Sequence, residues 1–290
     1  MNQEPTLPCA KHAFVLAGGG SLGAVQAGML AELIAAGRTP DLIVGVSAGA
    51  INGAFLAHDP SLPAMDRLTA LWGRVRTRDI LPVSLGSLLA LIGRRGYLAE
   101  SHGVRRLLER ELPFRQFSAA RIPLYIVATE QGTGAEVILS EGNVIEAILA
   151  SSAIPGVFPP VVLGGRTLVD GVVAAGTPIS AAVALGSTHL TIIPCGFTCV
   201  QSAVPRHAMG LAMHAITLLG ARQLRADFSR HAERAQLCVV PPLCPLAYSA
   251  YDYSHGTALV AAARLSTRKW IDDGGLDTRT FPDQLVAHHH

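Results

Sequence analysis

The sequence Asp41-Leu42-Ile43-Val44-Gly45-Val46-Ser47-Ala48-Gly49-Ala50 places one serine between an apolar strand and an alanine-rich helix. Its centre has the pattern Gly-x-Ser-x-Gly. The flanking positions of so tight a turn tolerate little more than hydrogen, and the serine is held in a strained backbone conformation. A helix that begins just after the serine offers free N–H groups to a developing negative charge. We therefore predict that Ser47 is a nucleophile and that the Ala48 N–H helps to hold an oxyanion.

A glycine loop precedes this turn in the chain. Residues 12–17, which are apolar except for His12, predict a strand. It runs into Gly18-Gly19-Gly20-Ser21-Leu22-Gly23 and then into a helix that stops at Gly37. The ends of two successive parallel strands lie side by side in a sheet. We expect the amides of this loop to face the Ser47 hydroxyl as an oxyanion hole.

The same loop also fits the dinucleotide-binding pattern Gly-x-Gly-x-x-Gly. That pattern needs an acidic residue at the end of the second strand. Here Asp41 begins the second strand, and Ser47 follows its far end. Dinucleotide binding is therefore the second-ranked interpretation of the loop.

A carboxylate ends a later apolar strand, in Thr167-Leu168-Val169-Asp170-Gly171. An ordinary carboxylate is a poor base for a hydroxyl, but burial beside the serine would raise its basicity. An aspartate that caps a turn is the structural alternative, because Asp-Gly is frequent in turns. These residues alone leave both interpretations of Asp170 open, a catalytic base or a turn cap.

Taken together, these stretches resemble the patatin-like phospholipase family over about Phe14 to Asp272. The block Ala150-Ser151-Ser152-Ala153-Ile154-Pro155, followed by Phe158-Pro159-Pro160, belongs to the resemblance, and we interpret its serines as structural. The resemblance implies a three-layer α/β/α fold with a largely parallel central sheet, and a lipid acyl hydrolase with a Ser47–Asp170 dyad. It also implies an oxyanion loop made of Gly18, Gly19, Gly20 and Gly23. Three further glycines would support the motifs: Gly45, Gly49 and Gly171.

Three positions depart from the family pattern. Leu22 stands where the family usually has Arg or Lys, Val172 where it has Gly or Ala, and Gly176 where it commonly has Asn. These departures motivate an alternative function, a catalytically weak lipid-binding or regulatory protein that has kept the fold.

A late histidine supports another alternative. An ordinary α/β-hydrolase esterase has Gly-x-Ser-x-Gly, then an acid, then a histidine late in the chain. His255, in the stretch 251–256, is the candidate for that histidine. This alternative predicts a Ser-His-Asp triad in place of the dyad.

Composition bounds the remaining classes. The chain has 290 residues, of which 50% are hydrophobic and 15% charged, so we expect one domain over residues 1–287, with 288–290 the remnant of a purification tag. The net charge of +2, with no block of Lys or Arg, predicts no nucleic-acid partner. The five cysteines have no zinc spacing, and the predicted chemistry requires no metal or cofactor.

The expected compartment is the cytoplasm, since no run of the sequence has the length of a membrane span or the pattern of a signal peptide. A cytoplasmic protein of this kind can also make peripheral contact with a membrane. The apolar segment 80–92 precedes Arg94 and Arg95. Core packing is the first-ranked interpretation of this short apolar run, and a lid or a contact with a lipid interface is the alternative.

Overall fold

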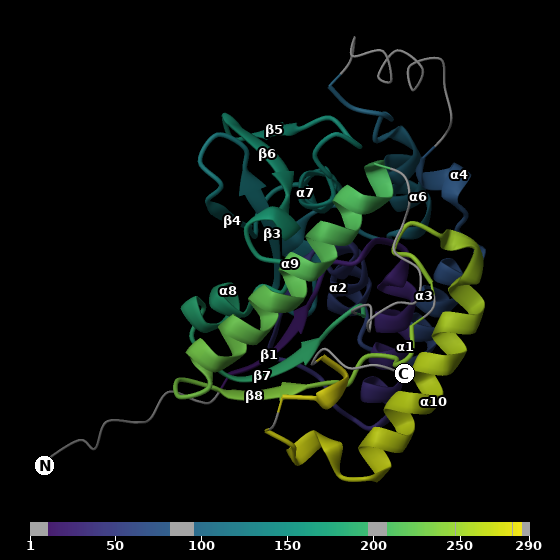
Figure 1. Cartoon of the computed structure of the whole chain (residues 1–290), viewed down its shortest axis with the longest axis vertical. Coiled ribbons are helices and arrows are strands. Elements are labelled where there is room, and N and C mark those ends of the chain that lie inside the picture. Colours follow the sequence, from purple (N-terminus) through teal and green to yellow (C-terminus); the bar gives the residue numbers. More distant parts are fainter. Residues whose placement is uncertain (1–10, 82–95, 197–207, 247, 280, 286–290) are drawn as a thin grey trace, which may run out of the picture.

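The computed structural model describes residues 11–81, 96–196, 208–246, 248–279 and 281–285 (Figure 1). The residues interpreted as a tag, and almost all of the segment proposed as a lid or lipid contact, lie outside the described residues.

The described residues form a mixed sheet of eight strands in the order β5-β6-β3-β2-β1-β7-β8, with β4 paired to β3 (Figure 1). The five strands β3, β2, β1, β7 and β8 are mutually parallel, whereas β4, β5 and β6 pair antiparallel. The largely parallel α/β sheet predicted from the sequence is therefore confirmed. The strands are β1 (Lys11–Leu16), β2 (Leu42–Val46), β3 (Leu124–Glu130), β4 (Glu136–Leu139), β5 (Val161–Leu163), β6 (Arg166–Asp170), β7 (Ser187–Ile193) and β8 (Gln236–Val239).

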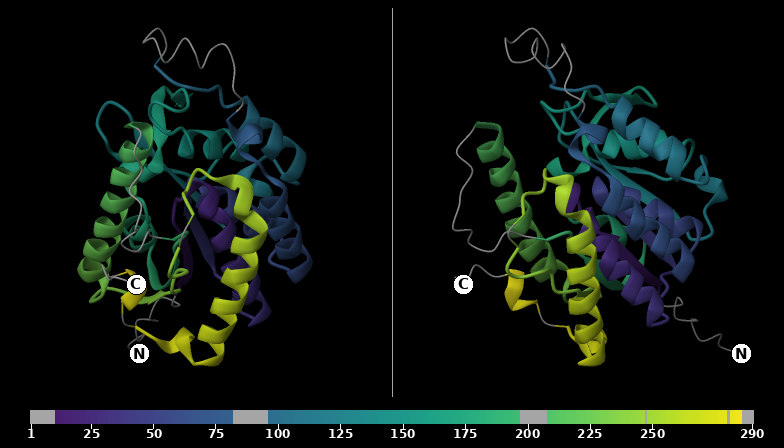
Figure 2. Two further views of the ribbon diagram at one scale, coloured as in Figure 1. Left: turned by 45° about the vertical axis from the view of Figure 1, so that its right-hand side comes forward. Right: turned by 90° about the vertical axis from the view of Figure 1, so that its right-hand side faces the viewer.

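Helices cover both faces of the sheet. Alternate residues of a strand point to opposite faces, so Phe14 and Leu16 of β1 join one core cluster, and Ala13 and Val15 join the other. The second cluster packs under α8 and α9, and Figure 2 shows α9 standing apart from α1 and α2. The helices are α1 (Gly23–Ala35), α2 (Ala48–His58), α3 (Leu62–Arg74), α4 (Thr77–Ile80), α6 (His102–Glu111), α7 (Val144–Ser151), α8 (Ile179–Ala184), α9 (Ala208–His231) and α10 (Gly256–Asp272).

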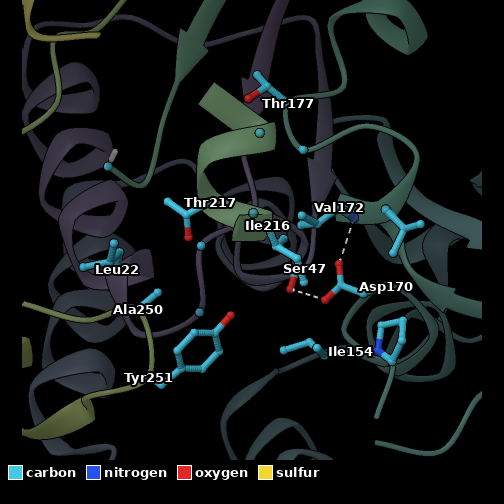
Figure 3. Close-up of a pocket in the computed structure, with 18 residues that line it drawn as sticks. Leu22, Ser47, Ile154, Asp170, Val172, Thr177, Ile216, Thr217, Ala250 and Tyr251 are labelled. Atoms are coloured by element: carbon cyan, nitrogen blue, oxygen red, sulfur yellow. Dashed lines mark hydrogen bonds between the residues drawn. The ribbon is translucent and has the colours of Figure 1, made fainter. Parts of the chain in front are cut away.

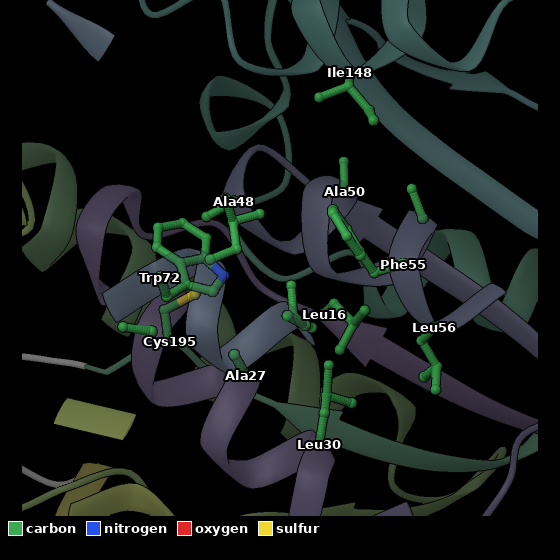
Figure 4. Packing of buried hydrophobic residues seen from close by; sticks show 14 of the residues in the cluster. Leu16, Ala27, Leu30, Ala48, Ala50, Phe55, Leu56, Trp72, Ile148 and Cys195 are labelled. Carbon is green, nitrogen blue, oxygen red and sulfur yellow. The ribbon is translucent and has the colours of Figure 1, made fainter. Parts of the chain in front are cut away.

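Helix α2 lies very close to the sheet because its first turns carry small residues. A Cβ atom on Gly45 would come within 2.6 Å of the Gly49 carbonyl oxygen, and a Cβ on Gly49 would collide with the Leu16 carbonyl. Glycine is therefore required at both flanks of the turn. Figure 4 shows the core beneath the helix, where Ala50 and Phe55 pack with Leu16.

The C-terminal helix α10 is fixed to α1. Glu32 of α1 is buried and accepts hydrogen bonds from Arg264 Nε at 2.7 Å and from Arg268 Nε at 2.8 Å. A buried carboxylate needs such partners. These ion pairs fix α10 against α1. The segment before α10 is held to the glycine loop by a separate contact, the hydrogen bond from the Ser21 N–H to the Ala250 carbonyl oxygen at 2.7 Å.

Candidate active site

Ser47 has the backbone of a strained elbow between β2 and α2. Its φ is 53° and its ψ is −119°, and it is the one non-glycine residue with positive φ in the described part of the chain. The Ser47 N–H donates to Ser151 Oγ at 2.8 Å, and Ser151 Oγ donates to the Val127 carbonyl oxygen at 2.5 Å. Strain of this kind persists only where the surroundings enforce it. Ser151 is thus a support of the elbow, in agreement with its interpretation as structural.

Asp170 reaches Ser47 through the order of the strands. Strand β3 lies between β2 and β6, with Val46 opposite Val127 and Asp170 opposite Ala128. Neighbouring strands are about 4.8 Å apart, so the two backbones flank β3 and their side chains meet across it. Ser47 Oγ donates to Asp170 Oδ2 at 2.9 Å, and the Val172 N–H donates to Oδ1 at 2.9 Å (Figure 3).

Burial sets the electrostatics of Asp170. The residue is 2% exposed, and its burial raises the pKa to about 7, although the hydrogen bonds from Val172 and Ser47 act in the opposite direction. A buried carboxylate is costly to ionise because it loses its hydration. A carboxyl group with this pKa can exchange a proton with a hydroxyl at neutral pH.

The predicted oxyanion donors divide into two groups. The Gly18 N–H donates to the Gly176 carbonyl oxygen at 3.0 Å, and the Gly23 N–H bonds the carbonyl oxygens of Gly20 and Ser21. Both amides are therefore engaged within the protein, which corrects the expectation that the whole loop faces an oxyanion.

The other predicted donors are the N–H groups of Gly19, Gly20 and Ala48. No acceptor among the described residues engages them, and all three residues line cavities that contain Ser47. Gly20 has a φ of 55°, which glycine adopts without strain. The geometry narrows the predicted set of donors to these three.

A buried polar chain, which sequence reasoning missed, braces the loop and the elbow. Trp72 Nε1 donates to Asn52 Oδ1 at 2.7 Å, and Asn52 Nδ2 donates to Gln26 Oε1 at 2.8 Å and to the Gly23 carbonyl oxygen at 3.0 Å. Gln26 Nε2 donates to the Ile193 carbonyl oxygen at 2.7 Å. The available signal was a single amide side chain within each of two largely apolar helices, Gln26 in α1 and Asn52 in α2, since fully buried amides must be paired.

The three departures from the family pattern have clear places. Leu22 is 2% exposed, and together with Val172 it lines the cavity that holds Asp170. At Val172 the backbone N–H supports the carboxylate, and this contact is independent of the side chain. The Gly176 N–H donates to Gln223 Oε1 at 3.3 Å, and Gln223 Nε2 donates to the Ala174 carbonyl oxygen at 2.7 Å, so α9 clamps the segment that follows Asp170.

His255 does not join the site. Its Nε2 lies 3.2 Å from Asp252 Oδ2, and its ring stacks on Tyr248 at a centroid distance of 4.0 Å. The triad alternative needs a histidine between Ser47 and the acid. The structure places Asp170 directly on Ser47, so it does not bring a triad together.

From the same tail, Tyr251 is the residue that enters the cavity. Its ring projects inward in Figure 3, and its hydroxyl has no hydrogen-bond partner among the described residues. Burial, followed by the charge of Asp170, raises the pKa of this phenol, so it stays a hydrogen-bond donor at neutral pH.

The dinucleotide alternative lacks its acidic residue. Asp41 accepts a hydrogen bond from the His12 N–H at 2.7 Å, at the amino ends of β1 and β2. The glycine loop lies at the opposite ends of these strands. A ribose bound at the loop would find Ser47 there and no carboxylate from Asp41.

The described residues contain neither a cluster of metal ligands nor a membrane-spanning helix. No group of three His, Cys, Asp or Glu side chains able to hold a metal ion occurs within the described ranges. Over those ranges, too, no helix combines the length and the apolar character needed to cross a bilayer.

Comparison with known proteins identifies similar sequences. The family model described as Patatin-like phospholipase matches residues 14–183, more than half of the chain. An uncharacterised NTE family protein of Mycobacterium bovis is 30% identical over 252 residues, which cover 84% of this chain and 38% of that protein. The mouse patatin-like phospholipase domain-containing protein 7 is 25% identical over 186 residues, 63% of this chain and 13% of that protein. The chain thus spans well under half the length of these relatives.

Among solved structures, VipD from Legionella pneumophila superposes with a TM-score of 0.44 at 14% identity, covering 92% of this chain and 67% of that one. A TM-score below 0.5 is too low to support an inference about function.

Proposed function

Because this chain belongs to the patatin-like phospholipase family, we propose that it is a serine hydrolase that cleaves carboxylic ester bonds of lipids. The observation that carries the proposal is the 2.9 Å hydrogen bond from Ser47 Oγ to the buried Asp170, at an elbow with positive φ. A nucleophile within hydrogen-bond reach of a base is the arrangement that covalent catalysis requires.

The acylation step begins with the ester carbonyl carbon above Ser47. Ser47 Oγ attacks this carbon while its proton passes to Asp170 Oδ2, and the carbonyl electrons move onto the oxygen. The tetrahedral intermediate then collapses, the bond to the alkoxy oxygen breaks, and the leaving alcohol takes the proton from Asp170. The product is an acyl ester of Ser47.

The oxyanion is held by backbone amides. In the proposal the N–H groups of Gly19, Gly20 and Ala48 point to the developing charge, and the positive end of α2 adds to the stabilisation. Removing one donor of this kind from an enzyme typically costs about 100-fold to 1,000-fold in kcat.

Deacylation repeats the chemistry with water. Asp170 takes a proton from the attacking water, whose oxygen bonds to the acyl carbon. The bond to Ser47 Oγ then breaks, and the proton returns to that oxygen. The free acid leaves, and the reaction needs only water as a co-substrate.

The proposed substrate is a membrane or dispersed lipid ester, such as a phospholipid. Exposed apolar side chains support this: Val173 lines the cavity and is 55% exposed, and Leu219, on the helix that supplies Ile216 to the same cavity, is 66% exposed. Exposed apolar side chains on elements that line a cavity suit a substrate presented by a lipid surface. Peripheral contact with such a surface is part of the proposal.

The test combines covalent labelling with turnover. Wild type, Ser47→Ala, Asp170→Asn and His255→Ala are treated with a fluorophosphonate probe, mapped by mass spectrometry, and assayed on p-nitrophenyl butyrate. We expect the label on Ser47, no turnover in the first two variants, and turnover in His255→Ala close to wild type. A wild type that neither labels nor turns over would instead favour the lipid-binding or regulatory protein suggested by Leu22, Val172 and Gly176.

A further inference from the structure

Two cavities meet at Ser47. Both are lined by Ser47, Gly20 and Ile154, and they extend from these residues in different directions. An ester that reacts at Ser47 also extends in two directions from its carbonyl carbon, with the acyl chain on one side and the alcohol portion on the other. The two cavities therefore correspond to the two halves of the substrate.

The first cavity, here called the Tyr251 pocket, contains the proton carrier. It is lined by Asp170, Thr177, Ile216, Thr217 and Tyr251 besides the glycine loop (Figure 3). The carbonyl oxygen of Ala250 accepts a hydrogen bond from the Ser21 N–H at 2.7 Å, so the chain next to Tyr251 is joined to that loop. The Tyr251 hydroxyl is thus held within the pocket on a fixed backbone.

The second cavity, the Trp72 pocket, has apolar walls. It is lined by Ile51, Leu71, Trp72, Val104, Leu107 and Phe158, on helices α2, α3 and α6 and on the segment after α7. Asp170 does not line it. Pockets with such walls bind alkyl chains by removing apolar surface from water.

The position of Asp170 decides which half of the ester occupies which pocket. The group that protonates a leaving oxygen must lie within hydrogen-bond reach of that oxygen. Because Asp170 borders the Tyr251 pocket alone, the alkoxy oxygen must lie on that side of Ser47. The acyl chain then extends to the other side, into the Trp72 pocket.

We propose that the Trp72 pocket binds the fatty acyl chain, and that the Tyr251 pocket binds the alcohol portion and aids its departure through a hydrogen bond from the Tyr251 hydroxyl. This assignment rests on the proposed hydrolase function. It makes Leu107 a residue that sets acyl-chain length and Tyr251 a residue that acts on the leaving group.

The acyl half is tested with two esters of the same alcohol, p-nitrophenyl butyrate and p-nitrophenyl dodecanoate. We expect Leu107→Trp to lower the dodecanoate-to-butyrate ratio of kcat/KM at least tenfold. Ile216→Trp adds the same bulk to the Tyr251 pocket, and we expect it to change that ratio less than threefold. Leu107→Ala, which removes bulk from the wall, should raise the ratio and guards against a misfolded tryptophan variant.

The alcohol half is tested with two esters of the same acid, p-nitrophenyl butyrate and benzyl butyrate. Benzyl alcohol is the poorer leaving group, so loss of a hydrogen bond to its oxygen has the larger effect. We expect Tyr251→Phe to lower the benzyl-to-p-nitrophenyl ratio of kcat/KM at least tenfold, whereas Leu107→Ala leaves this ratio within threefold.

The outcomes separate this assignment from the function on which it rests. A wild type that labels on Ser47 and hydrolyses these esters, but whose acyl-chain ratio responds to Ile216→Trp and not to either Leu107 variant, overturns the assignment alone. Unchanged leaving-group ratios in Tyr251→Phe overturn the role of Tyr251. Absence of both labelling and turnover in the wild type overturns the proposed function, and the assignment with it.

Discussion

Two aspartates of this protein, each in contact with a hydrogen-bond donor, have opposite properties. Asp170 is 2% exposed and accepts a hydrogen bond from Ser47, and burial raises its pKa to about 7. The side chain of Asp252 is 43% exposed and contacts His255, and hydrogen bonds from Ser254 lower its pKa. The partner alone therefore does not decide what a carboxylate can do. Asp170 is a base of suitable strength because it has lost its hydration. Asp252 keeps its hydration and serves as a turn cap.

The largest expected difference between the two aspartates is in activity. Asp170→Asn removes the proposed base, and we expect kcat/KM for p-nitrophenyl butyrate to fall by a factor on the order of 10³ or more. Asp252→Asn keeps an oxygen that can accept from Ser254, and we expect a change within about twofold. Circular dichroism of both variants controls for folding. Equal losses of kcat/KM in the two variants would mean that Asp170 has no special role in the reaction.

The pH profile of kcat/KM is the next test. Asp170 must be ionised to accept the Ser47 proton, and its pKa is about 7. We expect kcat/KM to rise about tenfold per pH unit below pH 7 and to level off above it. Asp252→Asn should leave the midpoint in place. A midpoint near pH 4 in wild type would mean that burial does not control the base.

Stability should respond to pH with opposite sign at the two sites. Folded Asp170 keeps its proton up to about pH 7, whereas the unfolded chain loses it near pH 4, so its contribution to the free energy of unfolding declines as pH rises between these values. Asp170→Asn lacks this titration, so its free energy of unfolding should rise relative to that of wild type by up to about 4 kcal/mol as the pH rises from about 4 to about 7. A pKa change of one unit is worth about 1.4 kcal/mol.

Asp252 behaves in the opposite way, because its folded pKa is lowered. Its contribution to stability is present above the ordinary aspartate pKa and is lost as pH falls below it. Urea denaturation of the two asparagine variants and wild type between pH 3 and pH 8 measures both trends. If the stability of both variants, relative to wild type, changed in the same direction with pH, the opposite pKa shifts of the two aspartates would be contradicted.

Ser151, the last residue of α7, and the next residue, Ser152, offer a second comparison, between a hydroxyl that makes hydrogen bonds and one that makes none among the described residues. Ser151→Ala leaves the Ser47 N–H and the Val127 carbonyl without their partner, and we expect a loss of about 1–3 kcal/mol in the free energy of unfolding. Ser152 Oγ is buried and makes no hydrogen bond within the described structure. Ser152→Ala is the matched control, with an expected change of about 0.5 kcal/mol or less. Similar losses in both would mean that the elbow does not depend on Ser151.

The smallest expected effect belongs to His255. Its contact with Asp252 is solvent-exposed, and exposed contacts between side chains of this kind are worth about 0–1 kcal/mol. We expect His255→Ala to keep kcat/KM within about twofold of wild type and to shift stability only slightly. A variant that folds normally and has lost its activity would restore the triad that the contacts of His255 argue against.

Much of the fold could be predicted because its signals are local. The strand, glycine loop and helix of residues 12–36 follow from apolar runs and glycines, and so does the elbow at Ser47. The flanking residues 45 and 49 must be glycine for steric reasons that act within a few residues. Local patterns of this kind led to the family, to the parallel sheet and to the two candidate catalytic residues.

Other features depend on contacts between distant parts of the chain, and no local pattern reports them. That β3 separates β2 from β6, and so brings Ser47 and Asp170 together across one strand, is a consequence of strand order. The engagement of the Gly18 amide by Gly176, and the entry of Tyr251 rather than His255 into the cavity, follow from packing. The sequence by itself determined which groups are available, because glycine geometry and apolar periodicity are properties of neighbouring residues. Only the tertiary structure decided which of these groups are buried, engaged or free, because burial and pairing depend on residues far away in the chain.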